Sequence, residues 1–224
     1  MDKKIKLCMF DLDGTLLDTI DDIAGSMNFV LSSNNFPTHD AIWYKANVGN
    51  GARNLLLDAL PDKHGCREDM IDNLLSMYIE NYTGNCTVFT KPYNGVSELL
   101  HRLAGSSVQM AVATNKPQVS SEDVMKKYFP EINFAMIRGI VPGQAIKPDP
   151  NVAFEILDTL RISPEETIYV GDTEVDMLFA KRASLFSIGV LWGFRSREVL
   201  EKAGAKVIIE RPAQIMDYIN TNDS

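Results

Sequence analysis

The stretch Asp11-Leu12-Asp13-Gly14-Thr15 directly follows an apolar run, from Ile5 to Phe10, that predicts a buried β-strand. Gly14 gives the backbone the freedom to turn away from the end of this strand. Two carboxylates this close repel each other, and the second ionises reluctantly unless a cation or a proton lies between them. A turn-forming role explains one aspartate but not both. We therefore expect chemistry at this strand end, where open α/β sheets bind their ligands.

A second acidic cluster repeats this pattern. Gly171-Asp172 ends a short apolar strand that begins at Thr167, and Asp176 follows four residues later. If a helix begins near Thr173, both acids project toward one side of its first turn. The alternative is an N-cap Asp172 followed by a favourable first-turn acid. Carboxylate oxygens of this kind suit Mg²⁺, whereas the three histidines and three cysteines lack the spacing of a zinc site.

Two further segments lie between the acidic clusters. An apolar run ends in Thr114-Asn115-Lys116-Pro117, where a hydroxyl and free backbone amides could hold an anion, although Thr114 could equally be an N-cap. Downstream, Lys147 lies in Ile146-Lys147-Pro148-Asp149-Pro150, which predicts an extended segment before a helix, because each Pro biases the preceding residue away from the α region. A lone lysine of this kind is usually a solvated surface charge.

In this order, after successive strands, the four segments resemble the motifs of the haloacid dehalogenase superfamily of phosphotransferases. Those motifs are Asp-x-Asp-Gly-Thr, a Thr or Ser that ends a strand, a Lys, and Gly-Asp-x-x-x-Asp. Within the superfamily, four stretches are similar to the phosphoglycolate phosphatase-like branch: Asp13 to Thr19, Val48 to Arg53, Lys147 to Pro150 and Trp192 to Phe194.

The resemblance implies a phosphatase mechanism. Asp11 would attack phosphorus and form an aspartyl-phosphate, which divides a slow displacement into two steps. Asp13 would protonate the leaving alkoxide and then deprotonate the hydrolytic water. Asp11, Asp172 and the backbone carbonyl of Asp13 would bind Mg²⁺, with Asp176 nearby as a ligand or as an acceptor behind the ligands.

The resemblance also implies a substrate site. Thr114 and Lys147 would bind phosphoryl oxygens, with Asn115 in the same anion-binding segment, and Lys147 would offset the repulsion between nucleophile and substrate. Gly49, Gly51 and Arg53 belong to a loop in which Arg53 could bind a substrate carboxylate. A helix-capping turn with an exposed arginine is the equal alternative.

Helical patterning predicts a domain inserted into an α/β core. The chain from Asp18 to about Asn85 reads as helices, and the core pattern resumes after a hinge at Thr87 to Asn94. The predicted organisation is a Rossmann-like core of residues 1–17 and 88–224, a doubly wound parallel sheet, with an all-helical cap of residues 18–87 placed to close over the site as a lid. Later core strands are expected near Ile132 to Ile137, Phe186 to Leu191 and Lys206 to Ile209.

Composition excludes several classes of partner. The chain has 224 residues, of which 45% are hydrophobic, and a net charge of -8. This charge argues against a nucleic-acid or anionic-membrane surface, and no apolar run is long enough to span a bilayer. Three cysteines without a pairing framework suit a reducing cytoplasm. The oligomeric state does not follow from the sequence.

The sequence departs from the branch pattern at Arg138-Gly139-Ile140, where many relatives have Gly-Gly-Asp, and at Ala183-Ser184, where Ala-Gly is usual. Phosphoglycolate is therefore the first candidate among several small phosphate esters. A β-phosphoglucomutase or a pyrophosphatase shares the motifs. A phospho-accepting receiver domain, which would signal without turnover, also uses an acidic pair, a Thr and a Lys, but it has no large helical insertion.

Overall fold

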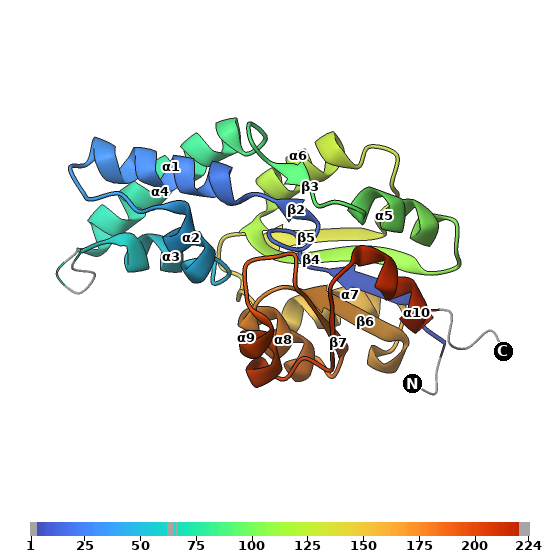
Figure 1. The fold of residues 1–224 in the computed structure, drawn as a ribbon. Coiled ribbons are helices and arrows are strands. Elements are labelled where there is room, and N and C mark those ends of the chain that lie inside the picture. Colours follow the sequence, from blue (N-terminus) through green and yellow to red (C-terminus); the bar gives the residue numbers. More distant parts are fainter. Residues whose placement is uncertain (1–3, 62–64, 66, 220–224) are drawn as a thin grey trace.

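A parallel sheet forms the centre of the computed structural model, which describes residues 4–61, 65 and 67–219 (Figure 1). Within these residues the sheet has six strands in the order β5-β4-β1-β6-β7-β8. Every adjacent pair is parallel. The strands are β1 (Leu7–Phe10), β4 (Gln109–Pro117), β5 (Met136–Ile140), β6 (Thr167–Gly171), β7 (Phe186–Val190) and β8 (Val207–Ile209). The expected doubly wound α/β core is confirmed.

The chain reverses its direction of travel across the sheet beside β1. It first proceeds outward from β1 through β4 to β5, and then returns to place β6 on the other side of β1. Phe10 pairs with Val112 of β4 and with Val170 of β6, so the three strands end close together. Ligands of open α/β sheets bind at this kind of switch point, beyond the carboxyl ends of the strands.

Helices cover both faces of the sheet. Alternate residues of β1 belong to two separate hydrophobic clusters, Cys8 and Phe10 to one and Leu7 and Met9 to the other, because side chains alternate along a strand. The first cluster includes residues of α5 (Val96–Ala104) and α6 (Gln118–Tyr128). The second includes residues of α7 (Asn151–Leu160) and α8 (Glu174–Arg182). These two helix pairs lie on opposite sides of the strands in Figure 1.

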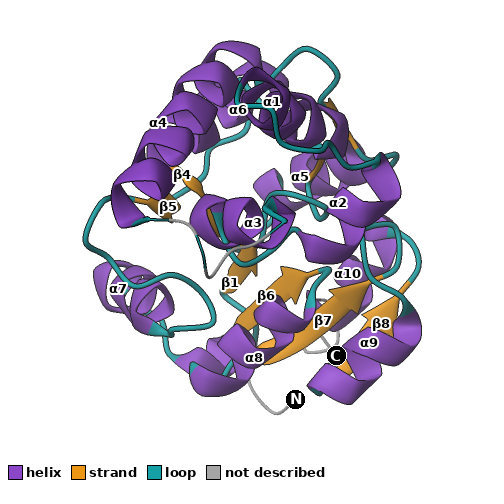
Figure 2. Ribbon diagram, turned by 90° about the vertical axis from the view of Figure 1, so that its left-hand side faces the viewer, coloured by secondary structure: helices purple, strands orange, loops and turns teal. Residues whose placement is uncertain are grey.

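A group of four helices stands beside the core: α1 (Ile20–Ser33), α2 (Ala41–Asn47), α3 (Ala52–Ala59) and α4 (Glu68–Asn85). Figure 2 looks onto this group, which we call the cap. The chain enters and leaves the cap through a two-stranded antiparallel ladder of β2 (Leu17–Asp18) and β3 (Lys91–Pro92). Asp22 of α1 ties the return segment to the cap, because its carboxylate accepts hydrogen bonds from the backbone amides of Phe89 and Thr90. The predicted domain boundaries at residues 18 and 87 stay a prediction. The two strands of the ladder lie close to these boundaries.

Some local expectations differ from the structure. The strand expected near Ile132 begins instead at Met136, and Ile132 packs against the core from the preceding loop. The small ladder of β2 and β3 was not expected, since strands of two residues carry no periodic signal. Ser184, which stands where glycine is usual, adopts a φ of 59°, the conformation that favours glycine after a helix. After Arg197–Ala203 (α9), the described chain ends with Ile215–Ile219 (α10).

Two other expectations concern the environment of the chain. Cys8 and Cys86 are buried and free, while Cys66 lies outside the described residues. Among the described helices, none combines the length and apolar character needed to cross a bilayer.

Candidate active site

The first acidic turn lies against the second at the switch point. Asp11 follows β1 and is 6% exposed, and Asp172, which follows β6, is fully buried. Gly14 makes this contact possible, since its φ is 86° and a Cβ there would lie 2.3 Å from Asp172 Oδ2. The Thr15 hydroxyl donates to Asp172 Oδ1 at 3.0 Å. The two acidic segments that the sequence separates by more than 150 residues therefore form one site.

Lys147 is buried within the acidic cluster and is only 4% exposed. Its Nζ lies 2.6 Å from Asp11 Oδ1 and 2.8 Å from Asp176 Oδ1, and it donates to the Tyr169 hydroxyl at 2.7 Å. Burial lowers the pKa of Lys147, but the charges of Asp11 and Asp176 raise it more, so the net shift is upward. The ammonium group therefore stays charged, and the surface-charge alternative for Lys147 is wrong.

The acids of the cluster are shifted in different directions. Burial raises the pKa of Asp11 to about 7, against the attraction of Lys147. Burial also raises the pKa of Asp172 well above its usual range, and the charges of Asp176 and Asp11 add to the shift. For Asp176, burial is outweighed by Lys147 and by hydrogen bonds from Thr173 and Tyr169, so its pKa is lowered. Asp172 is thus the acid of the cluster that most lacks a positively charged partner.

The residues present fit a divalent metal ion. Asp11, Asp172 and Asp176 each offer a carboxylate oxygen, and these oxygens lie within 4.8 Å of one another. The cluster holds three buried carboxylates, and the ammonium of Lys147 pairs with two of them, Asp11 and Asp176, which leaves an excess of negative charge that a hard cation would compensate. Asp176 Oδ1 already accepts from Lys147 and Tyr169, and its Oδ2 accepts from Thr173 N and Oγ1. These bonds favour a role for Asp176 in holding Lys147 in place, and not in binding the metal ion directly.

The start of α8 explains how Asp176 reaches this position. Thr173 is the N-cap, and its hydroxyl accepts from the Asp176 backbone amide while the Asp176 carboxylate accepts from Thr173 N. This reciprocal capping box satisfies two free amides of the first turn. Asp172 is not the N-cap, so the purely capping alternative for Asp172 is wrong.

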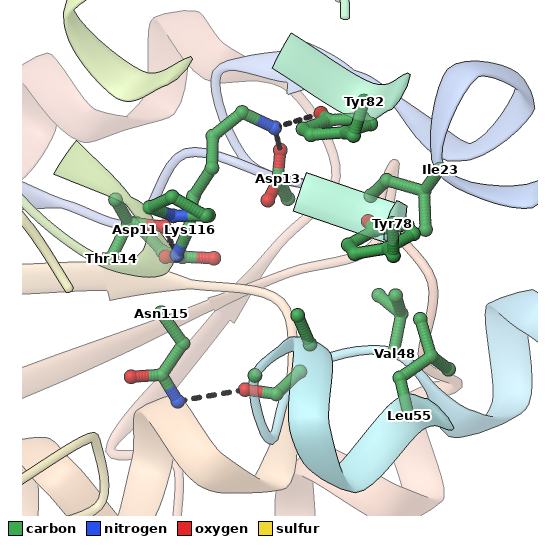
Figure 3. A pocket seen from close by; sticks show the side chains of 14 residues that line it. Asp11, Asp13, Ile23, Val48, Leu55, Tyr78, Tyr82, Thr114, Asn115 and Lys116 are labelled. Carbon is green, nitrogen blue, oxygen red and sulfur yellow. Dashed lines mark hydrogen bonds and ion pairs between the residues drawn. The ribbon is translucent and has the colours of Figure 1, made fainter. Parts of the chain in front are cut away.

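Asp13 is held by a different cation. Lys116, at 3% exposure, places its Nζ 2.8 Å from Asp13 Oδ1 and also contacts the hydroxyl of Tyr82 from α4 (Figure 3). The same Nζ lies 4.5 Å from the centroid of the Tyr82 ring. The Asp13 carboxylate is therefore separate from the acids around Lys147, and the metal-binding role predicted for its backbone carbonyl stays a prediction.

Thr114 and Asn115 occupy the carboxyl end of β4. Thr114 is buried, lines the pocket with Asp11, and is not an N-cap, because α6 is preceded by Pro117 in that position. Asn115 donates to the carbonyl oxygens of Gly49 and Lys147 and accepts from Lys147 N at 2.8 Å. The side-chain amide of Asn115 thus connects the cap, at Gly49, to the segment of Lys147. The predicted contact of Asn115 with phosphate stays a prediction.

Arg53 lies away from this group. Its guanidinium forms ion pairs with Glu68 and, at 2.6 Å, with Asp72, both on α4. It is absent from the described residues that line the pocket. The predicted role of Arg53 as a carboxylate reader stays a prediction, and these contacts favour its alternative as a surface arginine.

Several functional contacts lacked a strong sequence signal. Lys116 is two residues beyond Thr114, a spacing that places side chains on the same side of a strand, so it could have been singled out. Tyr169 lies in β6, just before Asp172, but the sequence of this strand reads only as apolar and gives Tyr169 no functional signal. The amide of Phe194 donates to Asp172 Oδ2 at 2.8 Å, which gives a structural role to the Trp192-Gly193-Phe194 stretch. Tyr82 has no such signal, since it belongs to the cap.

Comparison with known proteins gives a consistent result. A family model described as haloacid dehalogenase-like hydrolase matches residues 8–190. Phosphoglycolate phosphatase 1 of Pseudomonas aeruginosa is 31% identical over 215 residues, which are 91% of this chain and 76% of that protein. Phosphoglycolate phosphatase of Vibrio vulnificus is 28% identical over 97% of both chains.

A solved structure agrees over nearly the whole fold. A Lactobacillus delbrueckii subsp. bulgaricus protein assigned as a phosphoglycolate phosphatase superposes with a TM-score of 0.89, at 26% identity, over 97% of this chain and 99% of that one. The resemblance to the phosphoglycolate phosphatase-like branch is confirmed, and with it the expectation of a phosphoric monoester hydrolase. The chain belongs to the haloacid dehalogenase-like hydrolases.

Proposed function

We propose that the protein is a Mg²⁺-dependent phosphatase that hydrolyses a small phosphate monoester through an aspartyl-phosphate on Asp11, with phosphoglycolate as the first candidate substrate. The observation that carries the proposal is the position of Asp11. Its carboxylate is joined to Lys147 at 2.6 Å, belongs to the buried acid cluster, and lines one pocket together with Asp13. The names of the relatives from Pseudomonas aeruginosa and Vibrio vulnificus support phosphoglycolate.

In the first step, Asp11 attacks phosphorus. Its Oδ1 accepts the hydrogen bond from Lys147, which leaves Oδ2 as the nucleophilic oxygen. A bond forms between Oδ2 and phosphorus while the bond from phosphorus to the alkoxide oxygen breaks. Thr114 binds a phosphoryl oxygen. Lys147, whose three N–H groups are directed at Asp11, Tyr169 and Asp176, acts mainly through its charge, which offsets the repulsion between the anionic nucleophile and the anionic ester.

Asp13 transfers the protons. In its acid form it gives a proton to the leaving alkoxide, so that an alcohol departs. It then takes a proton from a water molecule, whose oxygen attacks phosphorus and breaks the bond to Asp11. Inorganic phosphate leaves, Asp11 returns as a carboxylate, and Asp13 is protonated for the next turnover.

Mg²⁺ would be held by Asp11, Asp172 and the backbone carbonyl of Asp13, and when bound it supplies the positive charge that keeps Asp11 ionised and neutralises phosphoryl oxygens. The need for that charge follows from the raised pKa of Asp11, because burial disfavours the ionised carboxylate. The cap excludes water from the reacting atoms. We also propose a cytoplasmic enzyme whose partner is a small molecule rather than a nucleic acid or a membrane.

The test is a phosphatase screen over phosphoglycolate, sugar phosphates and pyrophosphate, with and without EDTA. We expect turnover that EDTA abolishes and that Asp11→Asn lowers by at least about 10³-fold. The matched control is Asp21→Asn, an exposed acid in the first turn of α1, which should retain full activity. Full activity in Asp11→Asn would overturn the mechanism, and a preference for isomerising sugar phosphates would indicate a mutase.

The two roles of Asp13 can be separated with an activated ester. With p-nitrophenyl phosphate the leaving group needs little protonation, so Asp13→Asn should still release p-nitrophenolate in a burst. Because the second step lacks its base, phosphate should remain on Asp11. Mass spectrometry of the quenched protein should detect one added phosphoryl group. Unchanged steady-state turnover in this variant would contradict the assigned role.

A further inference from the structure

The pocket beside Asp11 and Asp13 continues between the sheet and the cap. It is a small cavity of about 50 Å³ whose wall includes Thr114 from the core. The cap contributes mainly apolar side chains to the wall (Figure 3): Ile23, Val48, Ala52 and Leu55, together with Tyr78 and Tyr82. The wall next to the phosphoryl site is thus formed jointly by the core and the cap.

Lys116 provides positive charge to this pocket. Among the described residues that line it, Lys116 is the only lysine or arginine. Its side chain is 1% exposed, so its charge is poorly screened by solvent. Lys147 is engaged by Asp11 and Asp176, and Arg53 is engaged by acids of α4. Any further anionic group of a substrate in this pocket must therefore be neutralised by Lys116.

Lys116 also has a donor available. An ammonium group carries three N–H donors. Within the described part of the chain, Asp13 Oδ1 and the Tyr82 hydroxyl accept two of them. The face of the Tyr82 ring, with its centroid 4.5 Å from Nζ, also lies against the ammonium. The third N–H can serve an acceptor in the pocket without the loss of either existing contact.

The position of Lys116 relative to Thr114 indicates which part of a substrate it meets. Both residues lie near the carboxyl end of β4, and both line the same pocket. If Thr114 holds a phosphoryl oxygen, the anion held by Lys116 belongs to a group of the same molecule that lies beside the ester.

We infer that Lys116 is a specificity-determining residue that binds a carboxylate on the leaving group, so that the preferred substrates are phosphate esters whose leaving group carries a carboxylate. The inference rests on the proposed phosphatase function and names its substrate class. The inference gives Lys116 the role of binding the substrate carboxylate, for which the sequence had indicated Arg53. Tyr82 contributes from the cap by holding the ammonium in place.

The experiment compares phosphoglycolate with ethyl phosphate, which has the same two-carbon skeleton but no carboxylate. Wild-type protein should prefer phosphoglycolate. Lys116→Met should lower kcat/KM for phosphoglycolate about 10- to 100-fold more than for ethyl phosphate, since one charge-assisted hydrogen bond is lost. Lys116→Arg should restore part of the preference. The matched control is Lys127→Met, because Lys127 is exposed and also lies over a tyrosine ring, that of Tyr128.

A binding measurement keeps the inference testable if Lys116→Met turns over both esters too slowly. In the Asp11→Asn background, calorimetry should find that Lys116→Met weakens phosphoglycolate binding selectively. Equal losses for both esters would overturn the inference, because Lys116 would then act only through Asp13. Loss of the preference in Arg53→Ala but not in Lys116→Met would overturn it as well. If wild-type protein hydrolyses other monoesters without preferring the carboxylate, this inference fails and the proposed function stands; if it hydrolyses none, the proposed function itself fails.

Discussion

Asp172→Asn should stabilise the metal-free protein and at the same time remove its response to Mg²⁺. Asp172 is fully buried, and burial together with Asp176 and Asp11 raises its pKa well above the usual range. Asparagine has nearly the same shape and can keep both hydrogen bonds. Its oxygen can accept from the Phe194 amide, and its NH₂ group can donate to the Thr15 hydroxyl.

The magnitude follows from the cluster geometry. Two unit charges at the 4.8 Å limit of the cluster repel by about 3.5 kcal/mol at an effective dielectric constant near 20. Uptake of a proton by Asp172 relieves part of this repulsion at neutral pH. We therefore expect the free energy of unfolding in EDTA to rise by about 1–3 kcal/mol in Asp172→Asn.

The pH dependence has a definite sign. An acid whose pKa is higher in the folded state takes up a proton on folding, so wild-type stability in EDTA should fall as pH rises above the unfolded value of about 4. Asp172→Asn should show a weaker fall. The advantage of the variant should therefore be absent near pH 4 and present at pH 7.

Urea denaturation with EDTA or with Mg²⁺ provides the assay. At a Mg²⁺ concentration 1,000 times its Kd, wild-type protein should gain about 4.1 kcal/mol, whereas Asp172→Asn should gain far less. The order of stability of the two proteins should then reverse on addition of Mg²⁺. If Asp172→Asn were the less stable protein in EDTA, or gained as much from Mg²⁺ as the wild type, the electrostatic account of the cluster would be refuted.

Three further predictions concern other contacts of the structure. Lys147→Met should lower the free energy of unfolding in EDTA by about 3–5 kcal/mol, measured by urea denaturation, because it leaves buried carboxylates unpaired; a change below 1 kcal/mol, roughly the worth of an exposed pair, would argue against a charged Lys147. Gly193→Ala should weaken Mg²⁺ binding, measured by calorimetry, since a Cβ would lie 2.4 Å from Asp172 Cβ; an unchanged Kd would contradict the tight contact. Glu166→Gln should lower Tm at pH 7, because a hydrogen bond from Lys6 lowers the pKa of Glu166 to about 2. That stabilisation is complete above the usual value of 4.5 and is lost as pH falls toward 2, so the difference in Tm between variant and wild type should shrink over the same interval.

The convergence of the two acidic clusters could be predicted because it depends on topology. Asp11 and Asp172 each follow a buried strand, and parallel strands present their carboxyl ends at one edge of the sheet. The role of Lys147 came from the resemblance and not from its local sequence, since a lysine among prolines is ordinary. Its burial depends on Tyr169 and Asp176, which are distant in the chain.

Contacts between cap and core could not be predicted. Tyr78 and Tyr82 have the i, i+4 spacing of an ordinary core-facing stripe on α4, and their rings are stacked at 5.5 Å. Which core residue they meet depends on how the cap is docked, and no local pattern encodes this. The same limit applies to Arg53, whose partners Glu68 and Asp72 lie on the next helix of the cap.

The two buried lysines bind different acids of the site, and neither pairs with Asp172. Lys147 binds Asp11, the proposed nucleophile, and Asp176 at the start of α8. Lys116 binds Asp13 and contacts the cap through Tyr82. Because separate cations hold Asp11 and Asp13, the two carboxylates of the first motif need not share a proton, which two adjacent acids would otherwise do. In the mechanism we propose, this separation lets Asp11 remain a nucleophile while Asp13 exchanges protons with the leaving group. Asp13 is also the acid whose lysine partner contacts the cap.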